Sequence, residues 1–197
     1  EIASCLVGSE MCIRDTPGTM NKNILIISAS PRKDGNSDLL CDEFAKGARS
    51  AGHRVEKVRL ADKTIHYCRG CGACNDTHVC LQKDDMADLL DKVLEADVIV
   101  LATPVYFYTL CAQMKTFIDR TVPRYLDMRN KEFYFILAAA EDDRSAMERT
   151  VECFRGFLDC LEGAEEKGVI YGTGAWKAGE IRQLPAMKQA RIMGIRV

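Results

Sequence analysis

Residues 24–37 (ILIISASPRKDGNS) have the pattern of an apolar strand followed by a polar, glycine-containing loop, and a helical pattern comes next. In this layout the backbone N–H groups of the loop and the helix N-terminus point toward one spot, where the helix dipole favours an anion by roughly 0.3–1 kcal/mol. Ser30, Asn36 and Ser37 can add side-chain donors. Arg32 adds a positive charge on a planar fork that suits phosphate. The segment therefore predicts a phosphate-binding loop.

The loop differs from the phosphate loops of several enzyme classes. The chain contains no G-x-x-x-x-G-K-[ST] sequence, and the loop is not a G-x-G-x-x-G turn. A phosphatase would need a cysteine nucleophile here, but none lies between Asn21 and Leu40. We therefore expect the loop to bind a phosphate without attacking it. A plain helix cap at Asn36 or Ser37 is the alternative, although a cap needs neither the arginine nor a second serine.

A second segment, residues 103–108 (TPVYFY), follows the apolar run 98–102. A proline directly after a strand makes a stiff turn, and the three aromatic side chains after it can stack on a flat ring. Alternatively, these rings only pack over the end of a sheet or against a second subunit. The candidate ring-binding residues are Thr103, Pro104, Val105, Tyr106 and Phe107.

Apolar runs that fit strands alternate with helical patterns along the chain. The expected strands are 24–29, 55–60, 98–102, 133–139 and 169–171, and the expected helices are 37–50, 86–94, 110–121, 144–161 and 187–193. This order predicts an α/β fold with a doubly wound, five-stranded parallel sheet in the order 2-1-3-4-5 and helices on both faces.

In that sheet order a ligand crevice opens at the carboxyl ends of the first and third strands, where the winding direction switches. The phosphate-type loop follows the first strand, and the aromatic segment follows the third. A ligand with a phosphate at one end and an aromatic ring at the other would meet both segments. FMN has that shape.

Four cysteines form the run C-x2-C-x2-C-x5-C within a long loop expected at residues 61–83: Cys68, Cys71, Cys74 and Cys80. Four thiolates at this spacing can surround one compact metal centre, and such crowding points to a reducing compartment. Zinc sites usually pair two C-x2-C units across a longer gap, so the run fits zinc less well. Free or redox-reactive thiols remain open. Cys41, Cys111, Cys153 and Cys160 lie on helical patterns and are expected to be buried.

The composition excludes several classes of protein. The chain has 197 residues with a net charge of −2 and 7% aromatic residues, which argues against a nucleic-acid surface. No apolar run approaches the roughly 20 residues that cross a bilayer. Residues 1–19 fit no element and resemble a translated adaptor sequence, so Met20 is the expected start and 20–197 the expected single domain. We expect a cytoplasmic protein.

The two ligand segments resemble the flavin loops of the flavodoxin-like NAD(P)H-dependent FMN reductase family. The motifs are S-x-S-P-R-x-x-G-N-S and P-V-Y-F, and the similarity runs from about residue 23 to the C-terminus. Ala29 stands where the family often has glycine. The resemblance implies an FMN site in which one loop holds the phosphate and the other meets the isoalloxazine ring. The implied phosphate residues are Ser30, Arg32, Asn36 and Ser37, and Pro31 and Gly35 of the same loop are further expected cofactor-binding residues.

The cysteine run resembles the compact motif of iron–sulfur flavoproteins, a branch of the same superfamily that carries a [4Fe–4S] cluster beside FMN. The resemblance implies an oxidoreductase that takes hydride from NAD(P)H and passes electrons to a quinone or other small acceptor. A ferredoxin-like protein could exchange single electrons with the cluster. A homodimer or higher oligomer is expected through 106–108 and 124–131, and no catalytic acid or base is needed. The alternative is a non-enzymatic electron carrier or redox sensor that uses the cysteine loop.

Overall fold

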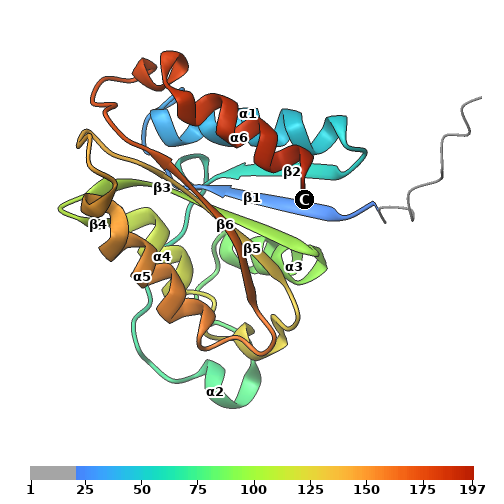
Figure 1. The fold of residues 1–197 in the computed structure, drawn as a ribbon. Helices are drawn as coiled ribbons and strands as arrows, with labels where there is room; N and C mark the ends of the chain where they lie inside the picture. The colour runs from blue at the N-terminus through green and yellow to red at the C-terminus, as the bar shows by residue number, and fades with distance from the viewer. Residues whose placement is uncertain (1–20) are drawn as a thin grey trace, which may run out of the picture.

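The structure is a computed structural model and describes residues 21–197, so the expected leader 1–19 and the expected start at Met20 lie outside the described part. Five strands form a parallel sheet in the order β2-β1-β3-β5-β6, which confirms the predicted topology (Figure 1). A sixth, two-residue strand pairs antiparallel with β3. The strands are β1 (Asn23–Ser28), β2 (Arg54–Arg59), β3 (Val98–Tyr106), β4 (Thr109–Leu110), β5 (Glu132–Ala138) and β6 (Glu165–Gly172).

Helices cover both faces of the sheet (Figure 1). One face carries α1 (Asn36–Ser50) and α6 (Pro185–Ile195), and the other carries α3 (Met86–Glu95), α4 (Ala112–Asp119) and α5 (Glu148–Leu158). Side chains alternate between the faces along each strand, so β1 sends Ile24 and Ile26 into one core layer and Leu25 and Ile27 into the other. Burial on both faces explains why these strands read as continuous apolar runs.

Helices α1 and α6 pack with their backbones almost in contact. A Cβ atom on Gly47 would lie 2.1 Å from the carbonyl oxygen of Arg191, and one on Gly194 would lie 2.1 Å from that of Phe44. Only glycine fits at these two crossing points. The contact holds α6 against the helix that follows the phosphate-type loop.

The adjacent strands β1 and β3 end at the same edge of the sheet. Ser28 pairs in register with Ala102, and the backbone N–H of Ala29 donates to the carbonyl oxygen of Ala102 over 2.9 Å. The loops that follow β1 and β3 therefore leave the sheet side by side, as the topology predicts.

Strand β3 is longer than predicted. The expected strand 98–102 continues to Tyr106, because Thr103 and Pro104 stay in register with Leu137 and Ala138 of β5. The expected stiff turn at Pro104 is therefore wrong, and the chain turns at residues 107–108 instead.

Other boundaries also differ from the predictions. The expected helix 144–161 is a 3-10 turn at Arg144–Met147 followed by α5, and the expected strand 169–171 is the eight-residue β6. The remaining 3-10 turns are Leu60–Asp62, Tyr125–Asp127 and Glu180–Gln183. Within residues 21–197 no helix has both the length and the apolar composition that a membrane crossing requires.

The cysteines outside the long loop divide into two groups. Cys41 and Cys111 are buried as expected, whereas Cys153 and Cys160 are exposed, so the prediction for those two is wrong. Burial and the nearby Asp38 carboxylate raise the pKa of the Cys41 thiol, which is therefore neutral near pH 7. Cys41 acts as a small apolar core residue.

Candidate functional site

A cavity of about 390 Å³ lies between the loop after β1 and the end of β3. Nine of the eleven predicted ligand-binding residues line it: Ser30, Arg32, Gly35, Asn36, Ser37, Pro104, Val105, Tyr106 and Phe107. The structure therefore brings together the two segments that lie about 70 positions apart in the chain. Ala138, Ala139, Ala140, Ala175 and Trp176 complete the wall.

The other two predicted residues do not line this cavity. Pro31 lies within the loop, outside the lining. Thr103 is fully buried beneath the hairpin, where its hydroxyl donates to the carbonyl oxygen of Pro104 and accepts from the backbone N–H of Cys111 over 3.1 Å. These contacts give Thr103 a structural part in holding the hairpin.

Ser37 presents an unsatisfied polar group in the wall of the cavity. Its side chain is buried, and its Oγ atom has no hydrogen-bond partner within the described residues. Leaving a buried hydroxyl unpaired costs about 1–3 kcal/mol, so the position suits an acceptor brought by a ligand. Ser37 lies in the first turn of α1, where backbone N–H groups also lack intrahelical partners.

The loop before α1 is closed by hydrogen bonds around Ser30. Its Oγ donates to the carbonyl oxygen of Arg32 over 3.0 Å and accepts from the backbone N–H of Arg32 over 3.3 Å. Gly35 packs directly against this hydroxyl, because a Cβ at Gly35 would lie 2.2 Å from Ser30 Oγ. The close approach explains the glycine in the N-cap position of α1.

The side chain of Asn36 fastens a third segment to the cavity. Its amide nitrogen donates to the carbonyl oxygens of Ala175 and Lys177, each over 3.0 Å, and its oxygen accepts from the backbone N–H of Gly179 over 3.0 Å. The amide is therefore committed to the loop after β6.

Trp176 stands on this third segment and lines the cavity. Its side chain is 71% exposed and therefore does not pack onto the sheet. Arg32 Nη1 donates to the Trp176 carbonyl oxygen over 3.3 Å. The Gly-Thr-Gly sequence at residues 172–174 precedes this segment, but an isolated pair of glycines is weak evidence for a ligand site.

A buried carboxylate near the phosphate-type loop is neutralised by basic side chains. Asp38 is 3% exposed and accepts from Ser28 Oγ over 2.6 Å. Lys57 Nζ lies 3.2 Å from one of its oxygens, and Arg59 Nε lies 3.6 Å from the other. This arrangement limits the repulsion that an acidic first turn would exert on an anion.

The hairpin between β3 and β4 carries backbone strain at the mouth of the cavity. Phe107 and Tyr108 have φ values of 50° and 63°, and Tyr106 pairs with Thr109 across them. Two left-handed residues in succession match a type I′ turn, which normally takes Asn-Gly. Non-glycine residues in this conformation cost roughly 1–2 kcal/mol each, and such strain often marks functional sites. Phe107 is 99% exposed, so burial does not explain the aromatic side chain there.

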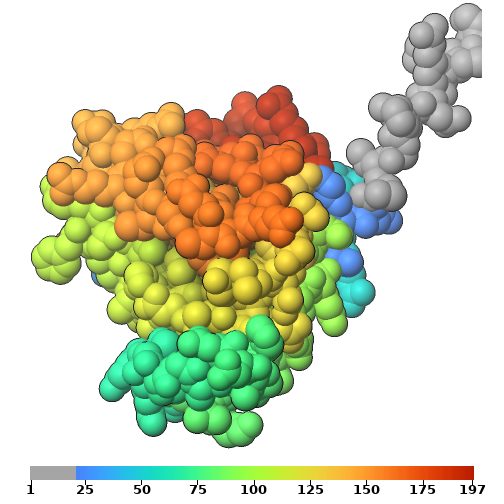
Figure 2. Space-filling model, turned by 90° about the horizontal axis from the view of Figure 1, so that it is seen from below, coloured from blue at the N-terminus to red at the C-terminus, as the bar shows by residue number. Residues whose placement is uncertain are grey.

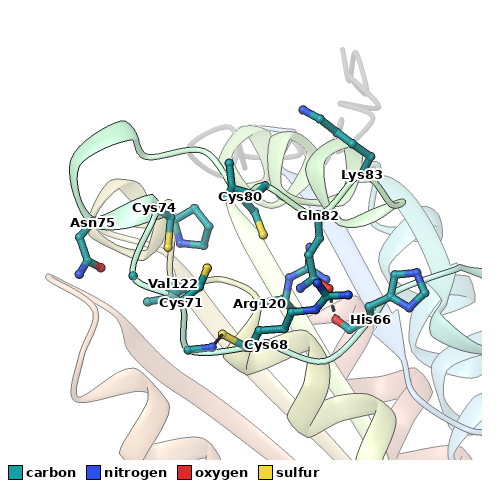
Figure 3. Close-up of a pocket in the computed structure, with 15 residues that line it drawn as sticks. His66, Cys68, Cys71, Cys74, Asn75, Cys80, Gln82, Lys83, Arg120 and Val122 are labelled. Carbon is teal, nitrogen blue, oxygen red and sulfur yellow. Dashed lines mark hydrogen bonds between the residues drawn. The ribbon is translucent and has the colours of Figure 1, made fainter.

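A second cavity, of about 650 Å³, is lined by all four cysteines of the long loop. Figure 3 shows their sulfur atoms around one opening, and Figure 2 shows residues 61–83 as a raised segment of the surface. All four are free cysteines, and a short helix, α2 (Cys74–Thr77), carries one of them. Gly70 and Gly72 have φ values of 63° and 73°, and these turns fold the backbone around the opening.

The four thiols fit a thiolate-bound metal centre by donor type and number. As the chain stands, these thiols are not close enough together to bind one metal ion, since no three His, Cys, Asp or Glu side chains of residues 21–197 form a compact metal-binding group. Binding a metal at this cavity would therefore require the thiols to draw together.

A buried ion pair lies beneath the cysteine loop. Arg120 and Asp84 side chains are 2% and 0% exposed, and the guanidinium binds the carboxylate through two hydrogen bonds of 2.7 and 3.0 Å. Burial alone would raise the pKa of Asp84, but hydrogen bonds from Arg120 and from the backbone of His66 and Met86 outweigh it and lower the pKa to about 2. The sequence pattern did not reveal this pair.

Known proteins resemble this chain in sequence. The model of the family described as NADPH-dependent FMN reductase matches residues 22–176. An iron–sulfur flavoprotein of Methanocaldococcus jannaschii is 39% identical over 162 residues, which cover 79% of this chain and 83% of that protein. An iron–sulfur flavoprotein of Archaeoglobus fulgidus is 47% identical over 97 residues, which cover 49% of this chain and only 44% of that protein.

Solved structures share the fold. The NAD(P)H:quinone oxidoreductase of Methanothermobacter marburgensis superimposes with a TM-score of 0.70 at 14% identity, covering 89% of this chain and 96% of that one. The FMN-dependent NADH-azoreductase of Bacillus anthracis, solved in complex with FMN, gives a TM-score of 0.65 at 16% identity, covering 88% and 98%. At these identities the likeness extends to the fold alone.

Proposed function

The chain belongs to the iron–sulfur flavoprotein branch of the NADPH-dependent FMN reductase family and is a flavin-dependent oxidoreductase, and from this premise we propose that FMN binds in the 390 Å³ cavity between the β1 loop and the β3–β4 hairpin. The observation that carries the proposal is the unpartnered Ser37 hydroxyl in the wall of that cavity. The phosphate would accept from Ser37, from backbone N–H groups at the start of α1 and from Arg32.

The isoalloxazine ring would lie against the hairpin side of the cavity. Pro104, Val105, Tyr106 and Phe107 line that side, and the small side chains of Ala138–Ala140 allow a flat ring to approach the sheet edge. Trp176 is exposed beside this opening and would cover part of the bound cofactor. These residues orient the cofactor and exclude water from one of its faces.

When bound, FMN supplies hydride and electron transfer, and the protein supplies position and electrostatics. The donor in this proposal is NAD(P)H, and the acceptor is a quinone or another small molecule. No side chain near the ring is required as a general acid or base.

We also propose that residues 20–197 form one domain of a cytoplasmic protein whose free thiols suit a reducing compartment.

The cysteine cavity would hold a [4Fe–4S] cluster through Cys68, Cys71, Cys74 and Cys80. The proposal rests on the donor set and on the matched relatives, which are named iron–sulfur flavoproteins. A cluster at this site would allow single-electron exchange with a ferredoxin-like partner.

The exposed side chains of Phe107, Tyr108 and Leu126 support assembly into a homodimer or higher oligomer.

Anaerobic purification followed by a visible spectrum, flavin and metal analysis and NADH and NADPH oxidation assays tests the whole proposal. We expect one FMN and about four irons per chain, with steady turnover. Replacement of Cys71 by Ser should remove iron and leave FMN. Zinc, or no metal, would contradict the cluster. Negligible turnover with FMN bound would favour the non-enzymatic carrier.

A further inference from the structure

Arg120 is an unusual residue in the lining of the cysteine cavity, because its charged side chain is almost completely buried. It is 2% exposed, although arginine is rarely buried unless paired. It lines the cysteine cavity (Figure 3) and also a neighbouring cavity that Cys80 lines. It lies directly after α4, whose buried side chains, Met114 and Phe117, are apolar. A charge in this position needs a specific reason.

The hydrogen bonds of the guanidinium account for all of its nitrogens except one. Nη1 donates to Asp84 and to the carbonyl oxygen of His66, and Nη2 donates to the second oxygen of Asp84. Nε is buried and has no partner within the described residues. An unpaired buried N–H is rare, so this N–H can donate to an acceptor that comes close to it when the site is occupied.

Asp84 fixes the direction in which this N–H points. Besides binding Arg120, its carboxylate accepts from the backbone N–H groups of His66 and Met86 over 3.0 and 3.1 Å. These two residues flank the cysteine run. The ion pair therefore ties together the two ends of the loop and holds the planar guanidinium rigidly against the cavity.

Sulfur is the acceptor that this site offers. Cys68 and Cys80 lie on either side of Arg120 in the cavity wall (Figure 3), and their thiolates would move inward on binding a metal centre. Hydrogen bonds to the sulfur atoms and nearby positive charge are among the factors that set the potential of an iron–sulfur centre.

We propose that Arg120 is a positioning residue of the metal centre, whose buried Nε–H donates a hydrogen bond to a cluster or cysteine sulfur and raises the reduction potential of the cluster. The inference rests on the proposed cluster. Asp84 acts through Arg120 by orienting the guanidinium. The replacement Arg120→Lys keeps the charge and removes both the fork and the Nε–H group.

The test compares anaerobic wild-type, R120K and R124K protein by iron content and by the midpoint potential of the cluster, followed by electron paramagnetic resonance. Arg124 is the matched control, because it lies four residues further on, is 36% exposed and pairs with Asp127. We expect about four irons in all three proteins. The potential should be lower in R120K and unchanged in R124K.

Each other outcome has a definite meaning. Wild-type protein without iron overturns the cluster and this inference together. Iron at the wild-type level with an unchanged potential in R120K overturns only the role of Arg120. If R120K does not fold, ¹⁵N-arginine labelling of the R69K protein decides the question, because Arg69 is the other arginine in the cavity wall. Hyperfine coupling of the reduced cluster to an arginine nitrogen is expected, and its absence refutes the inference.

Discussion

Replacing Gly35 with Ala should weaken FMN binding by disturbing the phosphate loop while leaving the backbone unstrained. Gly35 has φ −65° and ψ 158°, which alanine adopts readily. The new Cβ would lie 2.2 Å from Ser30 Oγ, closer than non-bonded atoms come. The hydroxyl must therefore rotate away, and both of its hydrogen bonds to Arg32 are lost.

The size of the effect follows from those two bonds. At about 0.5–1.5 kcal/mol each, their loss amounts to about 1–3 kcal/mol, or a roughly 5- to 150-fold weaker FMN affinity if the loop must re-form them on binding. Riboflavin lacks the phosphate and should lose much less affinity. Isothermal titration calorimetry of apoprotein with FMN and with riboflavin measures both.

Two further variants make this prediction sharp. Ser30→Ala removes the same two hydrogen bonds, so the G35A/S30A double variant should lose no more affinity than either single variant. Gly156→Ala is the matched control, because a Cβ there meets nothing within 4 Å. FMN affinity equal to wild type in G35A, equal losses for FMN and riboflavin, or additive losses in the double variant would refute the assignment.

Three other predictions concern stability and are checked by urea unfolding. The pKa of Asp84 is lowered to about 2 from its ordinary 3.8, so the ionised carboxylate stabilises the fold above about pH 4. About 2 kcal/mol of the unfolding free energy should therefore be lost as the pH falls from 5 to 2. The D84N/R120M variant should lose less over the same range, and an equal loss would contradict the prediction. Phe107→Gly should leave the unfolding free energy unchanged or raise it by up to about 1 kcal/mol, because it relieves a left-handed φ without exposing a buried ring; a clear drop would show that the turn is unstrained. Gly47→Ala should destabilise by about 1–3 kcal/mol through the clash with α6, whereas G156A should be neutral or slightly stabilising; similar values for both would contradict the close helix packing.

The sheet could be predicted because its strands are buried on both faces. The runs 24–29, 98–102 and 133–139 are continuous and apolar, and that pattern is typical of central parallel strands. The topology then brought the β1 loop and the aromatic segment to one edge. This inference needed only local patterns and the rule for switch points.

The hairpin could not be predicted, because its residues contradict local preferences. Pro104 normally interrupts a strand, yet it stays in register with Ala138. Phe107 and Tyr108 favour extended backbone, yet both are left-handed. The turn depends on the fit of the β3–β4 pair at the cavity mouth, and no short-range pattern carries that information.

Long-range polar contacts were also hidden from sequence patterns. The Asn36 amide meets Ala175 across 139 positions, and Arg120 meets Asp84 across 36. Neither contact has a periodic signature, since each depends on how two loops meet after the sheet has formed. Both contacts shape the walls of the candidate sites.

A crystal structure of the anaerobically prepared chain with FMN tests the central claim most directly. We predict that a phosphate oxygen lies within about 3.5 Å of Ser37 Oγ and that the isoalloxazine ring lies against Pro104–Phe107. FMN bound elsewhere, or bound in this cavity with its phosphate away from Ser37 and the start of α1, would contradict the account.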